Sequence, residues 1–221
     1  MQSEWTAKEK KVLEAKSRFL FDKPPSREMF PLSDFLEADT LIAFLEKEAC
    51  RIGTNNKKVA ASVLLKRYAF LAVGTLAAWS FFRKPLVFSA KNIWLVDCNK
   101  SEPWLPNFFI DTAAWDEGTG QIRNPLNHIG RVIESARKAT DLSSLIMWEN
   151  IAVYIFWLYE IVLKEEQFAH IRERATADFV WLLSPEQAGL FGDYQSNPLA
   201  RYYKEKTPIK DREELLRIRT T

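Results

Sequence analysis

The hydrophobic pattern is dominated by one long apolar segment, residues 57–82, KKVAASVLLKRYAFLAVGTLAAWSFF. Apolar side chains lie nearly all the way around it when it is drawn as a helix, which is typical of a helix buried on most sides. Small residues recur along it, and these are Ala60, Ala61, Ala72, Gly74, Ala77 and Ala78. Because small side chains let other elements approach the backbone closely, we expect this helix to form the axis of the fold.

The same segment must be weighed as a membrane span. A span needs roughly 20 residues with few or no charges. Lys66 and Arg67 interrupt the segment, and its uncharged remainder, residues 68–82, is short for that purpose. We therefore favour a buried core helix over a transmembrane helix and predict that the chain has no transmembrane segment.

Helices are also predicted on both sides of the central segment. Thr6 followed by Glu9 is a capping box, which marks the start of a helix. Asp39 is the predicted N-cap of a second helix, which Gly53 ends. Apolar spacing places helices at residues 6–20, 39–52, 125–138, 142–164 and 168–183, with short helices from there to 221. The last of these is a charged helix that begins at Asp211.

Between residues 86 and 122 the pattern changes to short β-branched and aromatic runs separated by turn residues. The predicted strands are residues 86–88, 93–96 and 108–110. We expect them to form a small antiparallel sheet. Helices, a small sheet and then helices again predict one domain, residues 1–221, that is mainly α with a small antiparallel β insertion (α+β). In this fold the helical domain surrounds the long central helix.

Composition narrows the function classes only slightly. With 47% hydrophobic and 27% charged residues, the chain has the composition of a soluble globular protein. Its net charge of +2, without a compact basic tract, predicts no nucleic-acid partner. Two cysteines argue against a disulfide framework. Because the first residues also lack the apolar core of a secretory signal, we expect a cytoplasmic protein.

Motifs that carry chemistry are scarce. The soft metal ligands are two cysteines and two histidines, namely Cys50, Cys98, His128 and His170. No two of them have the spacing of a ligand pair, so we predict no metal site among them. Glycine motifs for nucleotides and the nucleophile elbow of hydrolases are also absent from the sequence. Glu149 and Glu160 share one edge of an apolar helix, where we expect each to pair with an arginine from another helix.

Positive side chains recur next to apolar surface. A cleft that joins Arg, Lys and aromatic side chains suits a bulky anionic or oxygen-rich ligand. The predicted ligand-binding residues are Lys66, Arg67, His128, Arg131, Arg217 and Arg219. For any single one of them, the alternative is a solvated face or a structural ion pair.

Two stretches resemble a known family. Residues 57–96, from KKVAASVLLK to NIWLV, are similar to the core of FhuF-type ferric-siderophore reductases. The same region is shared with the C-terminal part of IucA/IucC-type siderophore synthetases. Residues 211–221, DREELLRIRTT, resemble an arginine-containing segment that in FhuF-type reductases directly precedes a Cys-Cys pair, which a Cys-x-x-Cys then follows. In that family these four cysteines hold a 2Fe–2S cluster.

The resemblance implies a cytoplasmic oxidoreductase, a ferric-chelate reductase. Its substrate would be a ferric siderophore or a ferric citrate-like chelate, and it would pass one electron from a 2Fe–2S cluster, supplied by an electron donor, so that ferrous iron is released. Cys50 and Cys98 do not match the cluster motif, so the resemblance implies cluster cysteines after Thr221 and identifies no catalytic residue. The alternative is a cluster-free siderophore-binding or scaffold module, or a detached siderophore-synthetase-like domain.

Overall fold

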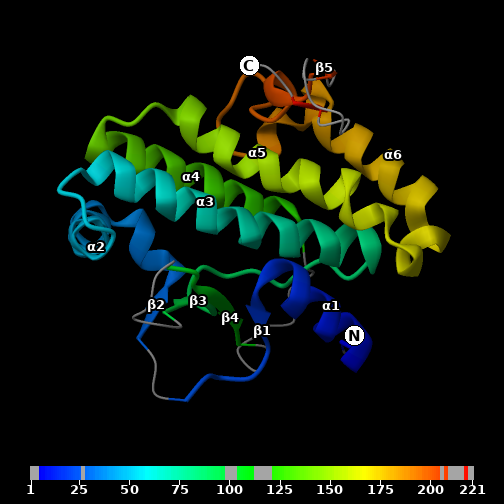
Figure 1. Ribbon diagram of the computed structural model, residues 1–221, viewed down its shortest axis with the longest axis horizontal. Coiled ribbons are helices and arrows are strands. Elements are labelled where there is room, and N and C mark those ends of the chain that lie inside the picture. The colour runs from blue at the N-terminus through cyan, green and yellow to red at the C-terminus, as the bar shows by residue number, and fades with distance from the viewer. Residues whose placement is uncertain are drawn as a thin grey trace.

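The helix α3 (Lys57–Leu76) lies at the centre of the computed structural model (Figure 1), which describes residues 5–25, 28–97, 104–111 and 121–204 and the short strands at 207–208 and 217–218. Helices α4 and α5 cover one side of α3, and α1, α2 and a small sheet lie against the other side. The helices are α1 (Ala7–Ser17), α2 (Ala38–Arg51), α4 (Arg123–Thr140), α5 (Ser144–Glu160) and α6 (Arg172–Leu183). Short 3-10 segments are η1 (Leu32–Leu36), η4 (Val162–Lys164), η5 (Glu166–Ile171), η6 (Pro185–Leu190) and η7 (Ala200–Tyr202).

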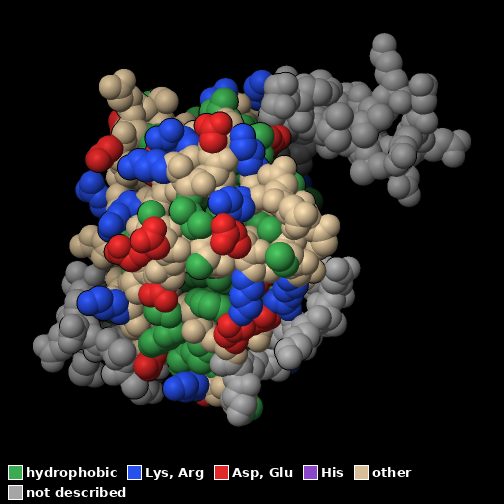
Figure 2. Space-filling view, turned by 90° about the vertical axis from the view of Figure 1, so that its left-hand side faces the viewer, with side chains coloured by type: hydrophobic (Ala, Val, Ile, Leu, Met, Phe, Trp, Pro, Cys, Tyr) green, Lys and Arg blue, Asp and Glu red, His purple; other side chains and the backbone are tan. Residues whose placement is uncertain are grey.

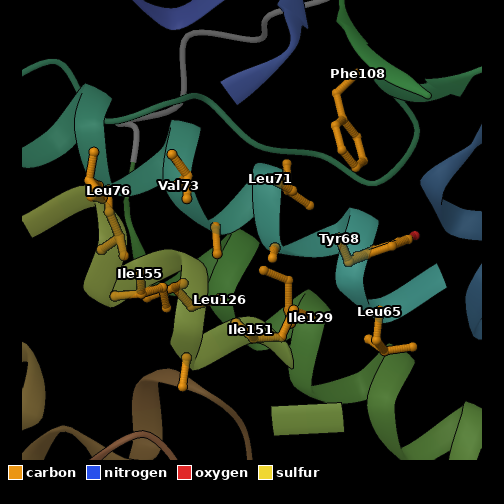
Figure 3. Packing of buried hydrophobic residues seen from close by; sticks show 14 of the residues in the cluster. Leu65, Tyr68, Leu71, Val73, Leu76, Phe108, Leu126, Ile129, Ile151 and Ile155 are labelled. Carbon is orange, nitrogen blue, oxygen red and sulfur yellow. The ribbon is translucent and has the colours of Figure 1, made fainter. Parts of the chain in front are cut away.

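Helix α3 is buried because apolar side chains lie on nearly all of its sides. Every residue from Leu71 to Ala78 is buried. Tyr68 and Leu71 point toward the sheet side, where Phe108 lies, and Ile129 and Ile151 pack on the opposite side (Figure 3). The prediction that α3 is the axis of the fold is therefore confirmed.

The C-terminal turn of the predicted central helix has a wider backbone spiral. Residues Ala77–Phe81 form a π-helical turn, η2, directly after α3. Within it, the Ser80 hydroxyl donates a hydrogen bond to Asp178 on α6 at 2.7 Å. Arg83 follows the turn in the left-handed region (φ 56°) and forms an ion pair with the same Asp178 at 3.0 Å. This polar group attaches α6 to the end of the central helix.

A four-stranded sheet lies below α3 in Figure 1, in the order β1-β4-β3-β2. Its strands are β1 (Phe19–Leu20), β2 (Met29–Pro31), β3 (Ile93–Val96) and β4 (Asn107–Ile110). The pairs β2–β3 and β3–β4 are antiparallel, and β1 runs parallel to β4. Gly74 of α3 allows the contact with the sheet, because a Cβ there would lie 2.1 Å from the nearest ring carbon of Phe19.

The predicted fold class, mainly α with a small β insertion, is confirmed, but the predicted sheet is corrected in two respects. The sheet is mixed, and residues 86–88 form no strand, since the chain from Lys84 to Ser89 has no regular secondary structure. The other two strands come instead from residues before α2, and the first of them, Phe19–Leu20, lies in the segment predicted as the end of a helix at residues 6–20. Pairing between distant segments depends on packing, which a local pattern does not contain.

Several helices begin or end at residues other than those predicted from the sequence. Helix α1 ends at Ser17, because Arg18 adopts the left-handed region (φ 58°) and the chain enters β1. The predicted N-cap Asp39 lies inside the first turn of α2, whose N-cap is Glu37. The predicted helix from Asp211 is wrong at Arg217–Ile218 (β6), which pairs antiparallel with Thr207–Pro208 (β5). The other residues of that predicted helix lie outside the described part of the chain.

Two helical segments are long and apolar enough to cross a membrane by length and composition alone, Lys57–Phe81 and Ser144–Lys164. Of their apolar windows, 67% and 50% respectively is buried within the protein. Core helices of soluble proteins meet the same criterion, so the finding is weak evidence for a span.

The end of the molecule where α3 begins and α4 ends lies at the left in Figure 1 and faces the viewer in Figure 2. Acidic and basic side chains are interspersed there among small apolar areas. Ion pairs join Lys57 to Glu46 at 3.3 Å and Lys58 to Asp141 at 3.5 Å. The described side chains of this face therefore carry mixed charge.

Candidate functional site

A cleft of about 640 Å³ lies between α4 and the segment that follows η6. Its walls are formed by the solvent-facing side of α4 and by residues 191–194, and the lining residues are Leu36, Asn127, Gly130, Arg131, Glu134, Ser135, Lys138, Phe191, Gly192, Asp193 and Tyr194. Ligand sites in proteins typically have volumes of roughly 300–1,000 Å³ and combine apolar walls with a few polar groups. We refer to this site as the α4 cleft.

Gly130 brings the two walls of the α4 cleft together. It is buried in α4, and a Cβ at this position would lie 1.7 Å from the backbone oxygen of Phe191. Gly192 then turns the chain with a φ of 128°, a conformation that only glycine adopts readily. The close approach thus requires glycine at position 130, and the backbone conformation of the turn favours glycine at position 192.

Tyr194 connects the cleft to the core of the helical layer. Its hydroxyl accepts a hydrogen bond from Trp148 Nε1 at 3.1 Å and donates one to Glu134 Oε1 at 3.2 Å. The Tyr194 ring packs edge-on against Trp148, with the ring centroids 5.6 Å apart. Burial raises the pKa of Tyr194 to about 12, so the hydroxyl keeps its proton at physiological pH.

The charges in the cleft are of both signs. Glu134 forms an ion pair with Arg137 at 2.9 Å. In contrast, neither Arg131 nor Lys138 has a carboxylate partner within the described ranges of the chain. Both of these side chains are exposed, and they lie two turns apart on α4. The cleft therefore offers two positive groups that a ligand carboxylate or other oxygen donor could bind.

The structure does not bring the six predicted ligand-binding residues into one site. Arg131 lines the α4 cleft, whereas Lys66 is exposed on α3 and does not. Arg67 is half-buried on α3, and its Nε has no hydrogen-bond partner among the described residues. Arg217 lies in β6, where only the backbone is described, and Arg219 is outside the described residues.

His128 is placed behind the cleft, in the core. Its ring stacks on Tyr68 at 6.0 Å and lies 5.3 Å from the ring of Phe88. Burial, with a smaller contribution from the charge of Arg131, lowers the pKa of His128 to about 3. The imidazole is therefore neutral at physiological pH and supplies no positive charge to a ligand.

Sequence reasoning missed Lys138 and Tyr194. A usable signal existed for Lys138, because Arg131, Ser135 and Lys138 recur at spacings of four and three residues and so share one face of a helix. No comparable signal existed for Tyr194, which reaches α4 only through the turn at residues 191–194.

Glu149 and Glu160 were predicted to pair with arginines, but Glu149 forms no ion pair with the described residues.

The described residues do not fit a 2Fe–2S cluster. Such a cluster takes four ligands, normally cysteine thiolates. Cys50 is an exposed free thiol, and Cys98 lies outside the described residues. No group of three or more His, Cys, Asp or Glu side chains with the geometry of a metal site occurs in the described part of the chain.

Comparison with protein-family models, with curated proteins and with solved structures found no match. The resemblance to FhuF-type reductases therefore stays a prediction.

The hydrogen bonds of the Tyr194 hydroxyl should contribute to the stability of the fold. Tyr194→Phe should lower the free energy of unfolding by about 1–2 kcal/mol, because Trp148 Nε1 and Glu134 lose their shared partner. Urea unfolding followed by circular dichroism measures this. Tyr154→Phe is the matched control, since the Tyr154 hydroxyl makes no hydrogen bond to a described residue. Equal losses in both variants would contradict a structural role for the Tyr194 hydroxyl.

Proposed function

We propose that the protein binds a ferric siderophore or a ferric citrate-like chelate in the α4 cleft, as the substrate-binding part of a FhuF-type ferric-chelate reductase of the cytoplasm. The observation that carries the proposal is the pair Arg131 and Lys138, which face the cleft without carboxylate partners among the described residues. Tyr194 gives this site an aromatic wall.

The chemistry of the ligand class fits these groups. Ferric chelates with citrate-type donors carry carboxylate oxygens and a net negative charge, which guanidinium and ammonium groups bind through charge-assisted hydrogen bonds. Glu134 and Asp193 on the same cleft disfavour ligands that are uniformly and strongly anionic. We therefore favour a chelate that combines a few carboxylates with neutral oxygen donors over a nucleotide or a polyphosphate.

Reduction is the part of the proposal that depends on the resemblance. Hard oxygen donors hold Fe(II) far more weakly than Fe(III), so one-electron reduction of the bound chelate would release ferrous iron. Because the described residues do not fit the cluster, we derive no step through it.

The second candidate is a cluster-free chelate-binding or scaffold module, which could use the same cleft. A 2Fe–2S protein is coloured and a scaffold is not, so the visible spectrum of the natural full-length protein, prepared without oxygen, distinguishes them.

Binding at the cleft can be tested with ferric citrate. Arg131→Gln and Lys138→Gln should each weaken binding about tenfold, because each removes a charge-assisted hydrogen bond worth roughly 1.5–3 kcal/mol. Quenching of tryptophan fluorescence reports binding, since Trp148 lies one hydrogen bond from the cleft residue Tyr194.

Lys66→Gln is the matched control for this titration. Lys66 is also an exposed lysine without an ion pair among the described residues, but it lies outside the cleft. Its replacement should leave the affinity for ferric citrate unchanged. If Lys66→Gln weakens binding as much as Arg131→Gln, or if none of the variants changes it, the cleft is not the binding site.

A further inference from the structure

The guanidinium of Arg67, in the middle of α3, donates no hydrogen bond to any described residue. Its side chain is half-buried, and its Nε is buried without a partner. Burial lowers the pKa of Arg67; Tyr154 opposes this effect, and the charge of Arg18 adds to it. A donor buried without a partner costs free energy, so the contacts of Arg67 within the described part of the chain do not explain its position.

Two further hydrogen-bond donors lie near Arg67, around the ring of Phe70. Phe70 follows Arg67 by about one turn on the same side of α3. The Arg18 guanidinium, at the end of α1, lies over this ring, with its Cζ 6.0 Å from the ring centroid. The ring of Tyr154 on α5 lies 5.0 Å from that of Phe70, and α1 and α5 both pack on α3 (Figure 1). We refer to these four residues as the Phe70 site.

Arg18 is held in place by the backbone. Its Nε and Nη2 donate to the backbone oxygens of Pro106 and Leu105, at 3.0 and 2.9 Å. A guanidinium has five N–H donors, so these two bonds leave three of them for another partner. Arg18 has no carboxylate partner in the described ranges, and the Tyr154 hydroxyl bonds to no described residue. The Phe70 site therefore combines donors from three helices without a carboxylate from the described part of the chain.

We propose that the Phe70 site binds a phosphate group, either of a soluble phosphate compound or of a lipid headgroup. A phosphate monoester carries about 1.5–2 negative charges near pH 7, which matches the two guanidinium groups better than the single charge of a carboxylate. The fork of a guanidinium donates parallel hydrogen bonds to phosphate oxygens. The Nε of Arg67 is buried, so its Nη1 and Nη2 make these bonds, and the Tyr154 hydroxyl donates a further one.

The Phe70 site differs from the α4 cleft in charge and in its residues. Glu134 and Asp193 lie in the α4 cleft and disfavour strongly anionic ligands there. No described carboxylate contributes to the electrostatic environment of Arg67. The two sites share no residue. Phosphate binding is therefore independent of chelate binding, and a titration with each ligand tests the two proposals separately.

Calorimetric titration of the full chain with inorganic phosphate, at about 0.15 M ionic strength, tests the proposal. Arg67→Gln should weaken binding at least about tenfold, because it removes the charge-assisted hydrogen bonds of the guanidinium. Arg67→Lys should have an intermediate effect, since it keeps the charge and loses the fork. Lys66→Gln is the matched control. Lys66 is the neighbouring residue and is exposed, so its replacement should change the affinity by less than about twofold.

Urea unfolding separates a binding defect from a folding defect. Arg67→Gln breaks no hydrogen bond or ion pair to a described residue, so the variant should be as stable as wild type. Phosphate stabilises folded proteins in general, whereas a specific site adds a further shift that depends on its affinity. If soluble phosphate is the ligand, it should raise the urea midpoint more for wild type than for Arg67→Gln.

Vesicles distinguish the two sources of the phosphate group. Sedimentation of wild type, and not of Arg67→Gln, with vesicles that contain phosphatidic acid would assign the site to a lipid headgroup if free phosphate does not bind. Vesicles of phosphatidylcholine alone are the control. The proposal is wrong if neither free phosphate nor phosphatidic acid binds wild type more tightly than Arg67→Gln. It is also wrong if Lys66→Gln weakens binding as much as Arg67→Gln, because the effect would then reflect net charge alone.

Discussion

Gly130→Ala should destabilise the protein by about 3 kcal/mol or more, which makes it one of the most damaging single changes available in this fold. The added methyl would lie 1.7 Å from the backbone oxygen of Phe191, and a backbone atom cannot move aside by rotating a side chain. Either α4 or residues 191–194 must shift, and the α4 cleft opens with them. Urea unfolding measures the loss of stability, and a titration with ferric citrate measures the effect on the cleft.

Gly189→Ala is the matched control for this prediction. Gly189 lies in η6, two residues before Phe191, and a Cβ there meets no atom within 4 Å. Its replacement by alanine should change the free energy of unfolding by less than about 1 kcal/mol, and it stabilises the fold if it mainly restricts the unfolded chain. Similar stabilities for the two variants would mean that α4 and residues 191–194 do not approach each other as described.

Acid should unfold the protein in part because of His128. The folded pKa of about 3 lies below the ordinary value of 6.5, so the unfolded state takes up the proton first. Above pH 6.5 the imidazole is neutral in both states and has no effect on stability. As the pH falls from 6.5 toward 3, this residue removes roughly 1.4 kcal/mol of stability per pH unit, up to about 5 kcal/mol in all.

The contribution of His128 is isolated by comparison with His128→Phe, which keeps an aromatic ring between Tyr68 and Phe88 but cannot be protonated. The variant should lose less stability than wild type between pH 6.5 and 4, measured by urea unfolding at each pH. His170→Gln serves as the control, because His170 is exposed and is the other histidine of the chain. Parallel curves for wild type and His128→Phe would show that His128 is accessible to protons in the folded state.

The helical part of the fold could be predicted because its signals are local. The capping box at Thr6 and Glu9 forms as expected, with both of its hydrogen bonds present. Residues 57–82 carry apolar side chains on nearly all sides of a helix, which predicted a buried helix, and α3 is buried as predicted. Side chains three and four residues apart meet on one helix face whatever the rest of the chain does, so the pattern is sufficient.

The sheet could be predicted only in part. Two strands, β3 and β4, lie where their β-branched and aromatic residues indicated. Their other partners, Phe19–Leu20 and Met29–Pro31, are separated from them by two helices along the chain. Residues 86–88 have strand-like composition and still pair with no strand; Leu86 is buried in the core and Phe88 packs against His128.

The sequence alone determined the long central helix, its small-residue positions and the mainly α class, because these depend on side-chain spacing within single segments. It also indicated Arg131 as a ligand-binding residue. Only the tertiary structure decided that His128 is a neutral core residue and that Lys66 lies outside the cleft. It likewise decided that Lys138 and Tyr194 line the α4 cleft together with Arg131. These assignments depend on which distant segments meet, and the meeting of α4 with residues 191–194 depends on the space left by Gly130.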